Sequence, residues 1–318
     1  MRSLAYYQHA FQKLNRGTTR YGKAPHKPVL LLSVLHEVEA GRIRDGRVYI
    51  TAELVSTFKD YWRQLVDTAN TANFSLPFYH LSKEKRGYWR LVEQPGMRVA
   101  LTTSHSIRSF ANLLDTVAYV QLEPELALLM QDSAAREVLR LTLLEAYFPQ
   151  KTLNGTTTYL TQLAHHMAAD DPVAYRTQFE ALARDLDPIT YEEEVFVRSG
   201  VFKREVPKLY GYACCVSGLR VEATADVQLV DACHIVPFRE THDDTLTNGL
   251  TLTPTLHRAF DRGLFWIDDA YRVRLAAGFR EIGESPYSIR QFEGLQIRLP
   301  DSTSHWPSLE NLRWRQPS

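Results

Sequence analysis

One stretch, residues 231–263, constrains the fold of this chain more than any other. It contains His234, Asn248 and His257 in the spacing His-x13-Asn-x8-His. An apolar strand pattern precedes His234, a short strand follows Asn248, and a helical pattern carries His257. Strand, loop, strand and helix then converge on one pocket. We therefore predict a ββα unit with a shared site.

The length and composition indicate an ordinary globular protein. With 318 residues, of which 44% are hydrophobic and 23% charged, the chain can bury a sizeable core, and two domains are expected. Its apolar runs are shorter than the roughly 18 residues that a membrane span needs. Cys214 and Cys215 are adjacent among only three cysteines, which argues against a disulfide framework. We expect a cytoplasmic protein without a membrane segment.

The charge is unevenly distributed, although the formal net charge is zero. In residues 1–110, Lys and Arg outnumber Asp and Glu by roughly two to one, whereas residues 170–194 are acidic. The basic third is either a surface that faces phosphates or a solvated face that binds nothing. Charge alone does not separate these two interpretations.

The pattern along the chain predicts an α+β fold in three parts. Residues 1–150 form a mainly helical domain with a small β hairpin, residues 151–195 a connector, and residues 196–318 a second domain. The elements expected in the first domain are helices to residue 12, over 28–41, 52–67 and 106–148, a strand over 47–50, and a hairpin over 74–92 with a basic tip. Beyond it we expect a helix over 173–186, a helix ending near residue 210, a hairpin through 268–269 and a strand near residue 295.

Residues 231–263 resemble the HNH nucleases, whose ββα-metal unit cuts phosphodiester bonds. Besides the three residues in register, the stretch carries the Asn-Gly-Leu and Phe-Asp-x-Gly elements of the restriction-type members, at 248–250 and 260–263. The resemblance implies that His234 is the general base, and imidazole suits this because it titrates near neutral pH. It implies that His257 binds one divalent metal, Mg²⁺ or Mn²⁺, with Ni²⁺ and Zn²⁺ as alternatives. Asn248 would fix the loop and orient the base.

The second metal ligand is the open point of this site. In many HNH sites the residue before the base is an Asp or His ligand, but here it is Cys233. We assign Asp231 instead, although an offset of three places it on the strand face opposite His234. Asp261 is expected to cap or brace the helix after His257. Three cysteines do not build a four-cysteine zinc site, so no structural zinc is expected.

The amino-terminal part resembles the sulfur-binding domain, which grips DNA carrying sulfur in place of a non-bridging phosphate oxygen. The motifs are APHKPVLLL (24–32), LPFYHL (76–81), GYWRL (87–91) and LLEAYF (143–148). The resemblance implies a shallow apolar pocket at Leu76, Pro77 and His80. The adjoining DNA backbone would be held by a set of basic side chains: Arg16, Arg20, His26 and Lys27.

These observations predict a metal-dependent endonuclease that binds modified, phosphorothioated double-stranded DNA and restricts foreign DNA. One alternative is an HNH restriction or homing nuclease that reads methylated cytosine or plain sequence. Another is a DNA-binding or interaction protein whose HNH unit is an inactive scaffold. With one active site per chain, cutting both strands needs a homodimer or sequential nicking.

Overall fold

The computed structural model describes residues 2–103, 107–169, 171–222 and 228–317. The fold is α+β, as expected, and its contacts divide the chain into two units. Unit 1 comprises residues 1–161 and 186–197, and unit 2 comprises residues 162–185 and 198–318. The expected connector therefore contributes to both units. Among the described residues, no helix is both long and apolar enough to span a membrane.

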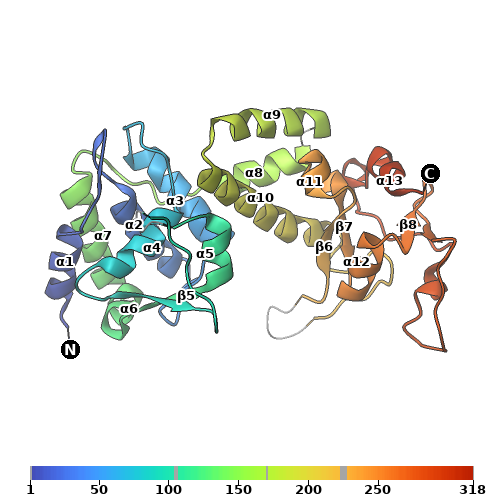
Figure 1. The fold of residues 1–318 in the computed structure, drawn as a ribbon, viewed down its shortest axis with the longest axis horizontal. Coiled ribbons are helices and arrows are strands. Elements are labelled where there is room, and N and C mark those ends of the chain that lie inside the picture. The colour runs from blue at the N-terminus through green and yellow to red at the C-terminus, as the bar shows by residue number, and fades with distance from the viewer. Residues whose placement is uncertain (1, 104–106, 170, 223–227, 318) are drawn as a thin grey trace. The chain divides into compact units, whose positions relative to one another are not determined.

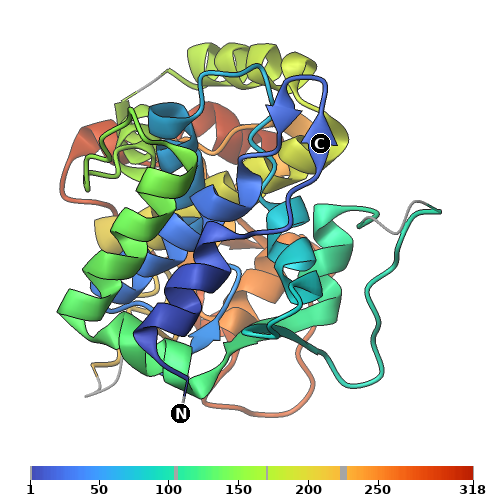
Figure 2. The same cartoon turned by 90° about the vertical axis from the view of Figure 1, so that its left-hand side faces the viewer.

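Unit 1 consists of helices that pack on one another and a small antiparallel sheet (Figures 1 and 2). The sheet has the order β3-β5-β4, and a separate two-stranded ribbon pairs β1 with β2. Helix α2 packs against α3 and α7, and α1 packs against α7. The strands are β1 (Thr18–Thr19), β2 (Gly22–Lys23), β3 (Arg47–Val48), β4 (Trp89–Glu93) and β5 (Val117–Leu122). The helices are α1 (Leu4–Gln12), α2 (His26–Glu39), α3 (Ala52–Leu65), α4 (Ser75–His80), α5 (Phe110–Thr116), α6 (Pro124–Gln131) and α7 (Ser133–Tyr147), with the short 3₁₀ helix η1 (Leu81–Lys83).

Unit 2 contains two β hairpins and several helices (Figure 1). The strands are β6 (Asp231–His234), β7 (Gly249–Leu252), β8 (Phe265–Ile267) and β9 (Val273–Leu275). The helices are α9 (Pro172–Asp185), α11 (Phe238–Thr241), α12 (Pro254–Asp261) and α13 (Leu309–Arg315), with 3₁₀ helices η2 (Leu246–Asn248), η3 (Ile289–Phe292) and η4 (Thr303–His305). Helices α8 (Tyr159–Ala169) and α10 (Pro188–Leu209) have residues in both units.

Five of the expected helices are confirmed, at residues 4–12, 26–39, 52–65, 172–185 and 188–209. The hairpin through 268–269 is confirmed by β8 and β9. The expected hairpin over 74–92 is wrong, because residues 75–80 form α4 and only β4 is a strand. The continuous helix over 106–148 is also wrong, because β5 interrupts it; residue 106 lies outside the described residues. In place of the expected strand near residue 295, the structure has an isolated β-bridge between Arg272 and Gln296.

A long-range carboxylate explains why α4 is helical. The backbone N–H groups of Phe74 and Ser75 donate to Glu193 over 3.1 and 2.9 Å, and the Ser75 hydroxyl also donates to this side chain. Asn73 Oδ1 accepts from the N–H of Leu76 at 2.9 Å. The first N–H groups of a helix have no partner within the helix, so these acceptors stabilise its start. Glu193 lies on α10, more than a hundred residues away in sequence, so no local sequence pattern predicts this contact.

Candidate active site and amino-terminal cavity

The ββα unit forms where the sequence predicts it. Strands β6 and β7 pair antiparallel, with His234 opposite Gly249, and α12 packs against both. A Cβ at Gly249 would lie 2.6 Å from the Val206 side chain, so the close approach of β7 to α10 requires glycine at this position. The Asn-Gly-Leu element thus has a packing reason as well as a functional one.

The His234 ring is held on two sides. It stacks on Phe202 of α10, with ring centroids 3.8 Å apart and an angle of 2° between the planes. Its Nε2 lies 2.8 Å from Oδ1 of Asp244, a carboxylate whose side chain is only 3% exposed. Within the parts of the chain that the structure describes, no hydrogen bond involves Nδ1 of this ring. Because the side chain is 22% exposed, the ring is both fixed and accessible.

Asn248 fastens the loop that follows His234. Its side chain is fully buried, and its Oδ1 accepts from the N–H of Val236 at 2.9 Å. Its Nδ2 donates to the carbonyl oxygens of Val236 and Asp243 at 3.0 and 2.9 Å. An amide is the side chain that can donate and accept together in this way.

His257 lies in a cluster with two further donor groups. Ligand atoms of Cys233, His257 and Asp261 all lie within 4.8 Å of one another. Nε2 of His257 is 3.4 Å from Oδ2 of Asp261, one helical turn further along α12. Thiol, imidazole and carboxylate are the donor types that zinc and similar metals take, often with a fourth position left for water. Burial above all, and then the neighbouring Asp261, raises the pKa of the Cys233 thiol, and a metal ion would displace its proton.

Asp231, the assigned second ligand, lies on the other side of the same imidazole. Its Oδ2 is 3.2 Å from Nδ1 of His257, and its side chain is 48% exposed. Asp261 in turn lies 3.3 Å from the guanidinium of Arg315, which also donates to the carbonyl oxygen of Phe260. Asp261 therefore does brace the end of α12, as expected, and also belongs to the donor cluster.

Three residues of this site have no counterpart in the sequence prediction. Phe202 and Asp244 hold His234, and Arg315 holds Asp261. The spacing of four between His257 and Asp261 places them on one helix face and is the signal that would have found the cluster. Nothing in the sequence near residue 315 marks a contact with α12.

Unit 1 contains a cavity of about 400 Å³ where residues of the APHKPVLLL and LPFYHL motifs meet the loop at residues 15–19. Its wall combines the apolar side chains of Leu76 and Pro77 with basic side chains. The lining residues that the sequence predicts are Arg16, His26, Lys27, Leu76, Pro77 and His80. Arg20 is not among the described lining residues; its guanidinium lies over the ring of Tyr21.

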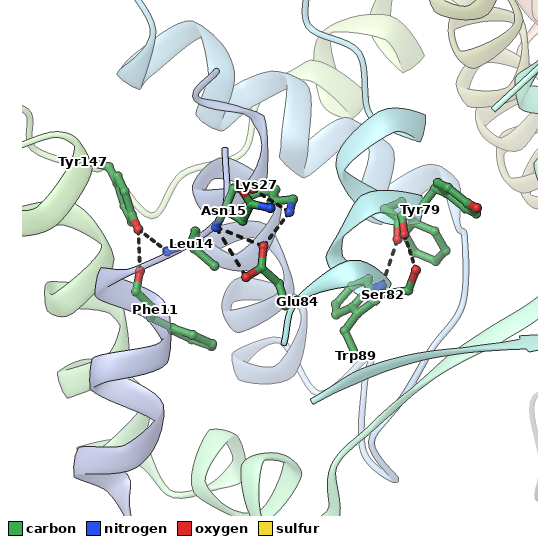
Figure 3. A network of polar contacts seen from close by, with 10 residues as sticks. Phe11, Leu14, Asn15, Lys27, Tyr79, Ser82, Glu84, Trp89 and Tyr147 are labelled. Carbon is green, nitrogen blue, oxygen red and sulfur yellow. Dashed lines mark hydrogen bonds and ion pairs between the residues drawn. The ribbon is translucent and has the colours of Figure 1, made fainter. Parts of the chain in front are cut away.

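The charge of Lys27 is already compensated in this structure (Figure 3). Its ammonium donates to the carboxylate of Glu84 and to the carbonyl oxygen of Asn15, the latter at 2.7 Å. Glu84 also accepts from the backbone N–H of Asn15 at 3.2 Å. Lys27 thus tethers the loop that bears Arg16, whose guanidinium lies over the Tyr147 ring, 4.5 Å from its centroid.

The two histidines of the cavity tend to be neutral. Burial lowers the pKa of His26, whose Nε2 lies 2.9 Å from the carbonyl oxygen of Thr71. Burial also lowers the pKa of His80, helped by the positive charges of Lys27 and Lys83. The cavity therefore carries less positive charge at neutral pH than its residue types suggest.

Comparison with known proteins supports the nuclease resemblance in unit 2. Residues 214–268 match the family model described as HNH endonuclease. No protein in the curated set matches the chain. Similar solved structures include the modification-dependent TagI restriction endonuclease, at 26% identity over 37% of each chain with a TM-score of 0.28. The sulfur-binding domain of ScoMcrA complexed with phosphorothioated DNA is 18% identical over 45% of this chain and 87% of its own, with a TM-score of 0.34. The type IV phosphorothioation-dependent restriction endonuclease ScoMcrA is 12% identical over 80% of this chain and 94% of its own, with a TM-score of 0.32. The chain thus spans little more than a third of the first of these proteins.

Proposed function

We propose that this protein is a modification-dependent endonuclease that binds phosphorothioated double-stranded DNA in unit 1 and hydrolyses phosphodiester bonds in unit 2. The observation that carries the proposal is the ββα unit at residues 231–261. There the HNH family match coincides with a held His234 and a donor cluster around His257. Restriction of foreign DNA would be its biological role.

The donor set around His257 favours a metal softer than magnesium. Cys233, His257 and Asp261 would hold it, and a buried thiolate ligand suits Zn²⁺ better than Mg²⁺, which takes oxygen ligands. When bound there, a divalent metal would stabilise negative charge on the scissile phosphate. Asp231 is the second carboxylate in reach of His257 and the alternative ligand.

His234 would act as the base of the hydrolysis. With Nε2 against Asp244, Nδ1 is the nitrogen left to take a proton from water. The water oxygen forms a bond to phosphorus while the bond to the 3′ oxygen breaks, and this oxygen gains a proton from solvent. The products are a 5′-phosphate and a 3′-hydroxyl, and His234 returns its proton to solvent. General-base catalysis of this kind contributes about 10²–10⁴-fold.

The apolar wall of the unit 1 cavity supports sulfur over oxygen as the preferred ligand atom. Sulfur is larger and more weakly hydrated than a phosphate oxygen, so transferring it into an apolar wall costs less free energy. Leu76 and Pro77 supply that wall, and the ammonium of Lys27 is occupied by Glu84. Arg16 at the same cavity would hold the adjoining backbone.

The test is a cleavage assay on three matched DNA duplexes, which carry one phosphorothioate, 5-methylcytosine or no modification. Reactions contain Mg²⁺, Mn²⁺, Ni²⁺ or Zn²⁺. We expect cutting of the phosphorothioated duplex, strongest with a metal that accepts thiolate. Binding of the same duplexes should favour sulfur and weaken steeply with salt, since each neutralised phosphate contributes a slope of about −0.9.

Each alternative gives a different pattern. Equal affinity for the sulfur and oxygen duplexes would remove the sulfur proposal and leave a nuclease that reads methylation or sequence. Binding without any cleavage, under every metal, would favour the inactive scaffold.

A further inference from the structure

We infer that Asp244 is a positioning residue for the base: it fixes the tautomer of His234 so that the proton-accepting nitrogen faces the substrate water. This inference rests on the proposed function, and it assigns a role to a residue that lies ten positions after His234 in a loop without helical or strand periodicity.

The geometry requires one direction for the hydrogen bond. A carboxylate accepts and does not donate, so Nε2 of His234 must carry the hydrogen that bridges the 2.8 Å to Asp244 Oδ1. A neutral imidazole then has its lone pair on Nδ1. This is the nitrogen for which no hydrogen bond occurs among the described residues. The bond therefore selects the tautomer that can act as a base.

The surroundings make this bond rigid. Asp244 is almost fully buried, so water competes little for its oxygen atoms. Phe202 stacks on the imidazole and prevents it from tilting out of the plane of the bond. Asn248 holds the backbone of Asp243, the preceding residue, through a 2.9 Å hydrogen bond. Ring, carboxylate and loop are each fixed by a separate contact.

Similar partners behind metal-site and catalytic histidines change activity by about 10–100-fold when they are removed. We expect an effect of this size here.

Asp243 provides a matched control. It is also a buried carboxylate, one residue earlier in the same loop, but its Oδ1 accepts from the N–H and hydroxyl of Thr245 at 2.9 and 2.7 Å. No hydrogen bond joins its side chain to His234 among the described residues. Asp243→Asn therefore perturbs the loop without removing the partner of the base.

The experiment compares wild-type protein, Asp244→Asn and Asp243→Asn as full chains, with two readouts. The first is single-turnover cleavage at saturating DNA, together with the DNA dissociation constant. Asp244→Asn should slow cleavage by about 10–100-fold with the dissociation constant within about twofold. Asp243→Asn should slow cleavage far less. The second readout is the ¹⁵N NMR spectrum of histidine-labelled protein, with His234 assigned by its loss in His234→Gln.

The spectrum of the wild-type protein should show His234 protonated at Nε2, and Asp244→Asn should shift it toward the Nδ1-protonated tautomer. An unchanged His234 spectrum in Asp244→Asn, or cleavage within twofold of wild type, overturns the inference. If the wild-type chain cuts no DNA, the proposed function fails, and the spectrum alone then decides whether Asp244 sets the ring.

Discussion

Replacing Asn248 by alanine tests whether one amide holds together the loop that follows His234. The substitution removes three hydrogen bonds and leaves the Val236 N–H and C=O and the Asp243 C=O without their side-chain partner. A buried hydrogen bond contributes about 1 kcal/mol net, and an unsatisfied buried group costs about 1–3 kcal/mol. Three such groups predict a loss of roughly 3–5 kcal/mol in the free energy of unfolding of unit 2. That is a large fraction of the stability of an ordinary domain.

The assay is urea denaturation of the full chain, with hydrogen exchange of peptides that span residues 235–248. Asn248→Ala should unfold unit 2 at lower urea and expose the Val236 amide to exchange. Gln228→Ala, an exposed amide just before β6, serves as the control and should change the free energy by less than about 0.5 kcal/mol. Asn248→Asp should destabilise at least as much as alanine, because a carboxylate would face two carbonyl oxygens. A loss below about 1 kcal/mol in both Asn248 variants would show that this amide does not hold the loop.

Three other predictions concern the metal, the cavity and helix α4. Cobalt added to the metal-free protein should produce a thiolate-to-metal absorption band. Cys233→Ser should lose this band, and Cys214→Ser should keep it. A band that survives in Cys233→Ser would show that Cys233 is not a metal ligand. Burial lowers the pKa of His26 and His80 below the ordinary 6.5, so the unfolded chain binds more protons than the folded one at mildly acid pH. The stability that these neutral histidines contribute is present above pH 6.5 and is lost as the pH falls through their folded-state pKa values. A His26→Gln/His80→Gln double variant should therefore show a shallower loss in acid than the wild-type protein, and an identical pH profile would count against neutral histidines. Glu193→Ala leaves the N–H groups of Phe74 and Ser75 unsatisfied, so it should lower the free energy of unfolding of unit 1 by about 2–4 kcal/mol. It should also weaken DNA binding, because α4 is displaced. Glu180→Ala, which removes an exposed carboxylate, should change neither quantity.

The sequence predicts the ββα unit well because its constraints are local. Strand alternation, the Asn-Gly-Leu element and the helix around His257 all act within about thirty residues. The same holds for the hairpin through 268–269 and for helices α1, α2 and α3 of unit 1. The buried amide of Asn248 holds the loop through Val236 and Asp243, partners that the sequence does not reveal.

The remaining features depend on contacts between distant residues. The sequence of residues 75–80 predicts a strand because Phe and Tyr favour strands, yet Glu193 supplies the acceptors that start a helix there. Residues 117–122 lie within a leucine-rich helical stretch, but β5 is stabilised by pairing with β3 and β4 on either side. No local pattern encodes either interaction.

The donor cluster around His257 depends partly on local sequence and partly on contacts between distant residues. Asp261 stands four residues after His257, which is a local signal, and its carboxylate also contacts Arg315. Cys233 precedes the base at the position of a known ligand type, but a lone cysteine is more often a buried apolar residue. Only the proximity of three donor atoms makes Cys233 a candidate ligand.

The most direct test of the account is the nicking of phosphorothioated plasmid by single-histidine variants. His234→Ala should lose cleavage by about 10²–10⁴-fold while binding the plasmid as tightly as wild type, because the base contributes to chemistry and not to binding. His165→Ala, which removes an exposed histidine of α8, should cut at the wild-type rate. Cleavage by His234→Ala at the wild-type rate would contradict the assignment of residues 231–261 as the active site.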